Sequence, residues 1–293
     1  MTALNVADAV FSGRAPAAEV ASGRRIAELD GLRGLAAIVV VVAHYFGEVP
    51  SGLRALTGGW IAVDVFFVLS GFLIGSIILE NRRAPNFFPV FFIRRACRIL
   101  PCYLASVLSV LIVLALLGSE RSWIDPPLPA LSYLSLTQNV YMAWTGVLGS
   151  PWLMPTWTVT VEEQFYLLAP LLLVLIPARH LVKMIVVGFA AALLFRAALV
   201  GENEIATLVL LPSRWDLLLA GILAAVICRE GWLRRPEDLF GLRLLPLLCV
   251  SALLPVLLLD PGRESGWFGI LSPLFMGIGV ASFIAALVSG GPE

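Results

Sequence analysis

The stretch that decides the fold reads Trp60-Ile61-Ala62-Val63-Asp64-Val65-Phe66-Phe67-Val68-Leu69-Ser70-Gly71-Phe72, and it stays apolar as far as Leu79. A segment of this length is long enough to cross the hydrocarbon core of a bilayer as one helix. It contains a single ionisable side chain, Asp64. Because a charge at membrane depth is costly unless it is paired or hydrated, this carboxylate indicates a functional site as well as a spanning helix.

The composition of the whole chain favours the same fold class. Of the 293 residues, 59% are hydrophobic and 14% are charged, and the mean hydropathy is +0.93. Soluble domains carry about 25% charged residues. We therefore expect an all-α, polytopic transmembrane helix bundle around a polar central cavity. Eight spans are predicted, at 34–50, 60–79, 100–118, 157–177, 181–200, 205–228, 244–260 and 267–289.

The stretch 128–148 is ambiguous, because it is long enough to span but contains Gln138 and Asn139. It is a ninth span, a re-entrant piece or an interfacial helix. With eight spans and a cytoplasmic N-terminus, 14 basic residues lie inside and 3 outside. Cytoplasmic loops are enriched in Lys and Arg, and a ninth span would weaken this asymmetry. We therefore predict that 128–148 does not cross and that both termini are cytoplasmic.

The ends of the chain and its metal-binding residue types are less informative. Residues 1–27 are rich in Ala, Ser, Gly and Arg, and are expected to form a flexible cytoplasmic tail before a transmembrane domain at 28–293. The sequence has two histidines and four cysteines without metal-like spacing. A metal site is therefore not expected, and the cysteines (Cys97, Cys102, Cys228 and Cys249) are interpreted as small apolar residues in or near helices.

Arg33 and His44 lie 11 residues apart in the first predicted helix. This spacing is about three turns, so the two residues share one face and are separated by ~16 Å along the axis. His44 and Asp64 lie at similar distances from the hairpin that joins the first two spans. A carboxylate near a histidine orients the ring and raises its pKa, which makes a general base. The alternative is that His44 is a structural histidine.

Two further predicted spans carry charged residues near the same end of the bundle. Glu162 and Glu163 lie five or six residues into one span, and Arg214 and Asp216 lie in another. Four helices are thus expected to place polar groups at one depth, which is the strongest signal for a site. Two alternatives stay open. The glutamates suit an ion or proton path in a transporter, and Arg214 and Asp216 suit a structural salt bridge.

A basic cluster, Arg94, Arg95 and Arg98, is expected on the cytoplasmic side, where Arg33 also lies. Arg95 and Arg98 share a face if this segment is helical. Guanidinium groups bind phosphate well, so an anionic donor substrate is one interpretation. The other is that these arginines only anchor the helix in the headgroup region and contact anionic lipid.

Between about residues 26 and 225, the chain resembles the acyltransferase-3 family of membrane O-acyltransferases that modify cell-envelope sugars. The resemblance rests on an ordered set of phrases. These are Glu28 to Gly34; Arg-x10-His at Arg33 and His44; FFxxSG at Phe66 to Gly71; RRxxRIxPxY at Arg94 to Tyr103; W[ST]xxVEEQFY at Trp157 to Tyr166; and Arg-x-Asp at Arg214 to Asp216, followed by Gly221.

The resemblance implies an enzyme of the bacterial inner (plasma) membrane that moves an acyl group from acyl-CoA, often acetyl-CoA, to a hydroxyl of a carbohydrate or lipid-linked glycan. His44 would be the general base, with Asp64, Glu162 or Glu163 as its carboxylate partner. The arginine cluster and Arg33 would bind the donor, and Arg214 and Asp216 would bind the substrate.

Several points of this resemblance stay open. Arg214 or a backbone amide would stabilise the oxyanion, and the hydroxyl would attack the thioester directly or through an acyl-histidine. The family usually has about ten spans and a late Tyr-Leu-x-His/Trp phrase, so the sequence is expected to be a fragment or a shortened member. A transporter or flippase and a non-catalytic scaffold are the rival classes.

Overall fold

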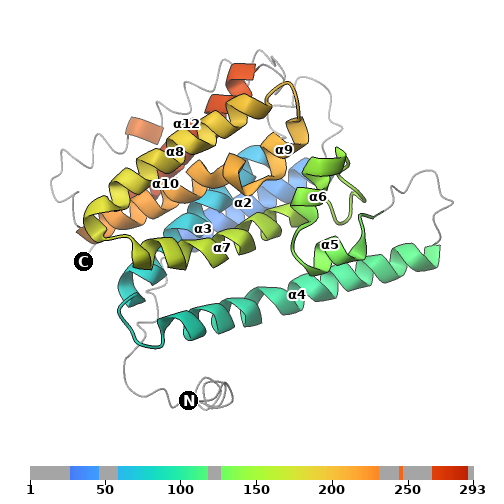
Figure 1. Ribbon diagram of the computed structural model, residues 1–293, viewed down its shortest axis with the longest axis horizontal. Coiled ribbons are helices and arrows are strands. Elements are labelled where there is room, and N and C mark those ends of the chain that lie inside the picture. Colours follow the sequence, from blue (N-terminus) through green and yellow to red (C-terminus); the bar gives the residue numbers. More distant parts are fainter. Residues whose placement is uncertain (1–26, 46–58, 118–126, 231–243, 247–265, 290–293) are drawn as a thin grey trace.

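The computed structural model describes residues 27–45, 59–117, 127–230, 244–246 and 266–289, and this part of the chain forms helices without any strand (Figure 1). The predicted tail, 1–27, lies outside the described residues except for its last position. The helices are α2 (Ala27–Tyr45), α3 (Gly59–Asn81), α4 (Phe87–Leu117), α5 (Ala130–Leu134), α6 (Gln138–Thr145), α7 (Thr156–Leu175), the short 3-10 helix η2 (Ala178–His180), α8 (Leu181–Leu199), α9 (Glu204–Val209), α10 (Leu211–Glu230) and α12 (Gly266–Ser289).

Six helical segments of the described part are long and apolar enough to cross a membrane: α3, α4, α7, α8 with η2, α9 with α10, and α12. They confirm the prediction of an all-α, polytopic membrane protein. The predicted span 34–50 overlaps α2, whose first turns carry charged residues. The predicted span 244–260 lies almost entirely outside the described residues. The total of eight spans therefore stays a prediction.

Helix α10 lies at the centre of the bundle and packs against α3, α8 and α12. Its contact with α3 is made backbone to backbone. A Cβ atom placed on Gly71 would overlap the carbonyl oxygen of Leu218, and one placed on Gly221 would overlap that of Val68. Small residues allow membrane helices to approach this closely. Glycine is therefore required at both positions.

The glycine contact also sets the register of the polar residues. Helices α3 and α10 run in the same direction, because Asp64 meets Arg214 near their first turns and Arg229 meets the last turn of α3. Asp64 precedes Gly71 by seven residues, and Arg214 precedes Gly221 by seven. Both offsets are two turns, or about 10 Å, so the two charges come level. We name the two ends of the bundle the Arg214 end and the Arg229 end.

The segment 128–148 does not span, as predicted. It forms α5 and α6, of five and eight residues. An eight-residue helix is about 12 Å long, against a hydrocarbon core of about 30 Å. The polar residues that made the segment ambiguous hold it to its neighbours. Gln138 donates to the Tyr103 hydroxyl of α4 at 3.0 Å, and Asn139 donates to Gln164 of α7 at 3.1 Å.

Helix α4 starts earlier than the predicted span 100–118. It begins at Phe87 and has 31 residues, or about 46 Å. The basic cluster therefore lies within the helix and not in a loop before it. The boundary was wrong because hydropathy locates only the apolar part of a helix, whereas Arg94, Arg95 and Arg98 extend it at one end. Figure 1 shows α4 along one side of the bundle, with α5 and α6 toward its C-terminal end.

The predicted span that carries Arg214 is two helices and not one. The chain breaks at Leu210, which is extended (φ −83°, ψ 141°), between α9 and α10. The cause is Pro212, which lacks an N–H and whose ring obstructs a continuous helix. The break frees carbonyl oxygens at membrane depth. Arg214 satisfies one of them by donating from Nε to the Leu208 carbonyl at 2.9 Å.

Candidate active site

Arg214 and Asp64 form a buried ion pair between the first turns of α10 and α3. The distance from Nη1 to Oδ1 is 3.3 Å, and the side chains are 7% and 2% exposed. Together with the bond from Nε to Leu208, this contact engages two of the five N–H donors of the guanidinium group among the described residues. The structure thus brings together two of the charged residues predicted to converge.

Asp216 follows Arg214 by two residues in α10, about half a turn, but belongs to a different ion pair. Arg196 of α8 donates to both of its oxygens, at 2.9 and 2.6 Å. Arg196 also donates to the carbonyls of Ser213, at 2.5 Å, and Ile270, at 2.9 Å. Arg214 and Asp216 therefore form no salt bridge with each other. Residues two apart on a helix point about 200° apart, so they face different neighbours.

Glu162 is the centre of a second polar group. Its Oε1 accepts from Ser70 of α3 at 2.6 Å, and its Oε2 accepts from Tyr166 of α7 at 3.0 Å. Arg33 of α2 and Arg95 of α4 also interact electrostatically with this carboxylate. Four helices therefore meet at Glu162, and this group joins two of the predicted arginines to a predicted carboxylate.

The two polar groups lie at different depths, so the prediction of one shared level was wrong. Ser70, which contacts Glu162, follows Asp64 by six residues in α3. Six residues correspond to about 9 Å along the helix. The predicted depths were counted in residues from the start of each helix, which assumes that α3 and α7 begin at the same depth in the membrane. Instead, the Glu162 carboxylate lies closer to the Arg229 end than Asp64 does.

The three arginines of the basic cluster have different surroundings on α4. The Arg95 guanidinium lies over the Tyr166 ring, 5.1 Å from its centroid, and interacts electrostatically with both Glu162 and Glu163. One oxygen of Glu163 is buried without a hydrogen bond from the described residues. Arg94 is exposed and does not join this group. Arg98 faces a cavity described next.

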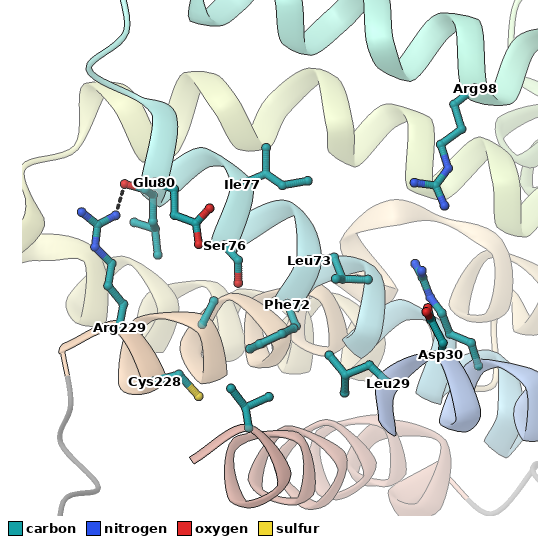
Figure 2. Close-up of a pocket in the computed structure, with 14 residues that line it drawn as sticks. Leu29, Asp30, Phe72, Leu73, Ser76, Ile77, Glu80, Arg98, Cys228 and Arg229 are labelled. Carbon is teal, nitrogen blue, oxygen red and sulfur yellow. Dashed lines mark hydrogen bonds between the residues drawn. The ribbon is translucent and has the colours of Figure 1, made fainter. Parts of the chain in front are cut away.

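A cavity of about 780 Å³ lies at the Arg229 end, between α2, α3, α4, α10 and α12 (Figure 2). We call it the charged cavity. Figure 2 shows Arg98 reaching toward it from α4, opposite Asp30, with Glu80 and Arg229 at the other side. The Arg229 guanidinium donates to the Leu79 carbonyl. The lining residues that carry charge are Asp30, Arg33, Glu80, Arg98 and Arg229.

A second cavity, of about 300 Å³, lies between α2, α3 and the start of α7. We call it the aromatic cavity. Among the residues that the structure describes, Glu162 is the only charged one that lines it. On α3, the residues that line the aromatic cavity (Val63, Phe66 and Phe67) lie toward the Arg214 end, and those that line the charged cavity (Phe72 to Glu80) lie toward the Arg229 end. Ser70, which donates to Glu162, lies between the two sets, so Glu162 lies where the two cavities approach each other, and Arg33 lines the charged one. The other lining residues are Val40, Val63, Phe66, Phe67, Met154, Pro155, Trp157, Thr158 and Val159.

His44 is the predicted site residue about which the structure says least. Its backbone belongs to the last turn of α2, one turn beyond Val40. Its side chain lies outside the described residues. The predicted pairing of His44 with Asp64 or a glutamate therefore stays a prediction.

Several residues of these groups escaped the sequence analysis. Arg196 stood within an apolar span, and a lone arginine at that depth is a usable signal. Ser70 and Tyr166 belong to recognised phrases, but an apolar context gives no sign that they bind Glu162. Arg229 looked like an ordinary basic residue at a helix end, and only the tertiary structure shows that it lines a cavity.

Polytopic helices, buried ion pairs and the charged and aromatic cavities define an integral membrane protein with an intramembrane polar site. Within this class, the chain belongs to the acyltransferase-3 family, because the sequence model of that family, described as "Acyltransferase domain", matches residues 26–292. The resemblance predicted from the sequence is confirmed. No solved structure matches the chain.

Three relatives carry more specific names. The chain is 33% identical over 158 residues to a putative peptidoglycan O-acetyltransferase, YrhL, of Bacillus subtilis; the match covers 52% of this chain and 24% of the relative. It is 32% identical over 157 residues to the peptidoglycan O-acetyltransferase OatA of Listeria monocytogenes, with shares of 51% and 24%. It is 31% identical over 160 residues to a putative O-acetyltransferase, SACOL0978, of Staphylococcus aureus, with shares of 52% and 25%. The matches thus span about a quarter of each relative.

Proposed function

We propose that this protein transfers an acyl group, acetyl in the simplest case, from acyl-CoA to a hydroxyl of a cell-envelope carbohydrate. Two cavities that approach each other near Glu162 support this function best. A group-transfer enzyme in a membrane needs a donor site and an acceptor site that meet at one reactive point. The relatives named as peptidoglycan O-acetyltransferases make peptidoglycan the first acceptor to try.

The acyl-CoA donor binds in the charged cavity. Arg33 and Arg98 present guanidinium groups there, which suit the phosphates of CoA. Arg229 adds a third guanidinium, although the Leu79 carbonyl already accepts from it. The positive-inside asymmetry supports a cytoplasmic position for this end of the bundle and for the N-terminus, on the side where acyl-CoA is available. The pantetheine arm would follow α2 from Arg33 toward His44, over ~16 Å.

His44 is the general base of the proposed reaction. It takes the proton of the acceptor hydroxyl while the hydroxyl oxygen attacks the thioester carbonyl. The new carbon–oxygen bond forms, the carbon–sulfur bond breaks, and the thiolate of CoA leaves and takes up the proton. Asp64 supports the imidazolium that forms. Arg214, with donors beyond its two described bonds, stabilises the oxyanion.

Transfer of label tests this function. Purified protein in proteoliposomes is given radiolabelled acetyl-CoA and peptidoglycan fragments, beside a His44→Ala variant. We expect label on the glycan as an alkali-labile ester with the wild type and none with the variant, whose thermal unfolding is unchanged. Label that stays on CoA with every envelope glycan would contradict the proposal and favour a transporter that uses Glu162 and Glu163.

A further inference from the structure

We infer that the aromatic cavity binds the acceptor, and that its ligand is a carbohydrate ring held between aromatic side chains and the Glu162 carboxylate. The inference rests on the proposed function and adds the place and the chemistry of acceptor binding. Its first support is the composition of the wall. Eight of the ten lining residues are apolar, and the others are Thr158 and Glu162. The charged cavity, in contrast, has five charged residues in its lining.

Three of the apolar lining residues are aromatic, and they come from two helices. Phe66 and Phe67 are adjacent in α3, and the Phe67 ring lies 5.9 Å from the Trp157 ring of α7, at 54°. A sugar ring presents C–H bonds on its faces and hydroxyls around its edge. It therefore needs an apolar wall for the face and hydrogen-bonding groups at the rim. The aromatic cavity supplies both.

Glu162 supplies a fixed hydrogen-bond acceptor for the hydroxyls of the sugar. Each of its oxygens already accepts one hydrogen bond, from Ser70 and from Tyr166. A carboxylate oxygen has two lone-pair sites, so each retains one for a ligand. The two existing bonds hold the carboxylate in one orientation, which reduces the entropy lost when a ligand binds. Thr158 adds a hydroxyl to the same lining.

An acyl chain is the competing occupant, and the carboxylate argues against it. An alkyl chain packed over Glu162 would remove water from the carboxylate without replacing its hydrogen bonds, which is unfavourable. A sugar hydroxyl replaces the water with a charge-assisted bond. The cavity also borders α2 at Val40, one turn before His44. An acceptor bound there lies next to the proposed general base.

Binding and kinetics of three variants test the inference. The variants are Phe66→Leu and Glu162→Gln, which change the cavity, and Phe88→Leu, which changes a partly buried phenylalanine of α4 outside both cavities. Soluble disaccharide fragments of peptidoglycan serve as the probe. Their binding is measured by calorimetry without donor, and their KM is measured with acetyl-CoA and with butyryl-CoA.

We expect the disaccharide to bind the wild type and the Phe88→Leu variant alike. In Phe66→Leu and Glu162→Gln, both its Kd and its KM rise about three- to tenfold, while the KM of acetyl-CoA stays within twofold. Disaccharide binding without any transfer would support the inference and contradict the proposed function. Unchanged disaccharide Kd and KM, or a Phe66→Leu variant that instead gains preference for butyryl-CoA, would overturn the inference.

Discussion

Two arginine–aspartate pairs involve residues two apart near the start of α10, Arg214 and Asp216, and the pairs differ in how many hydrogen bonds they make. Arg196 uses four hydrogen bonds, two to Asp216 and two to carbonyls of α10 and α12. Arg214 makes one contact with Asp64, at 3.3 Å, and one with a carbonyl. The first pair has almost no donor left for a ligand. The second retains several.

The difference separates a structural role from a functional one. A saturated, buried pair that ties α8, α10 and α12 together holds the bundle but binds nothing else. Arg214 has partners among the described residues for two of its five N–H donors, so it is suited to stabilising a reacting group. We therefore move Asp216 from the predicted substrate-binding residues to the framework, and keep Arg214 at the site.

The largest effect is expected from Arg196→Ala. The substitution leaves Asp216 charged and buried without its partner, which costs about 3–5 kcal/mol. Thermal unfolding in detergent measures the loss. The double variant Arg196→Met, Asp216→Leu is the control, because an apolar pair of similar volume restores stability. If the double variant is as unstable as the single one, the loss of stability does not come from an unpaired Asp216 charge.

The next effect concerns the other pair. Arg214→Met should lower kcat for acyl transfer by about 100- to 1000-fold, as the loss of an oxyanion donor does in other enzymes. Its melting temperature should fall much less than that of Arg196→Ala, because Asp64 has a further interaction. Parallel rate and melting measurements on the two variants give the comparison. Equal losses of stability would mean that the pairs do not differ in role.

A substitution at the helix contact breaks the second pair without touching the first. Gly221→Ala pushes α10 away from α3 because its Cβ overlaps the Val68 carbonyl. We expect a destabilisation of about 1–3 kcal/mol, together with slower transfer. Gly31→Ala is the matched control, since nothing lies within 4 Å of its Cβ, and helix propensity makes it neutral or slightly stabilising. Normal transfer by Gly221→Ala would show that the register of Asp64 and Arg214 is unimportant.

The smallest effect is expected at the bonds to Glu162. Ser70→Ala and Tyr166→Phe each remove one hydrogen bond to the carboxylate, at 2.6 and 3.0 Å. Each bond only orients the carboxylate, and the loss of that ordering costs about 0.5 kcal/mol, so the acceptor KM should rise about twofold in each, less than in Glu162→Gln. Tyr141→Phe, on α6 and outside both cavities, is the control. An unchanged acceptor KM in both variants would remove Glu162 from acceptor binding.

The sequence was sufficient for the fold class and for most charged members of the site. Asp64, Glu162 and Arg214 stand out because a charge in an apolar helix is rare and needs a reason. Which of these charged residues contact each other was not predictable in the same way. The contacts depend on the close approach of Gly71 and Gly221, which fixes how far α3 is shifted along α10. Pro212 breaks a span that hydropathy treats as continuous.

The central claim is that donor and acceptor approach Arg33 and Glu162 from opposite ends of the bundle. Proteoliposomes of known protein orientation test it directly, with radiolabelled acetyl-CoA on one side only and peptidoglycan fragments on the other. We expect label on the glycan when acetyl-CoA is on the side of the Arg229 end, and none when the two are exchanged. Equal transfer in both arrangements would contradict the claim.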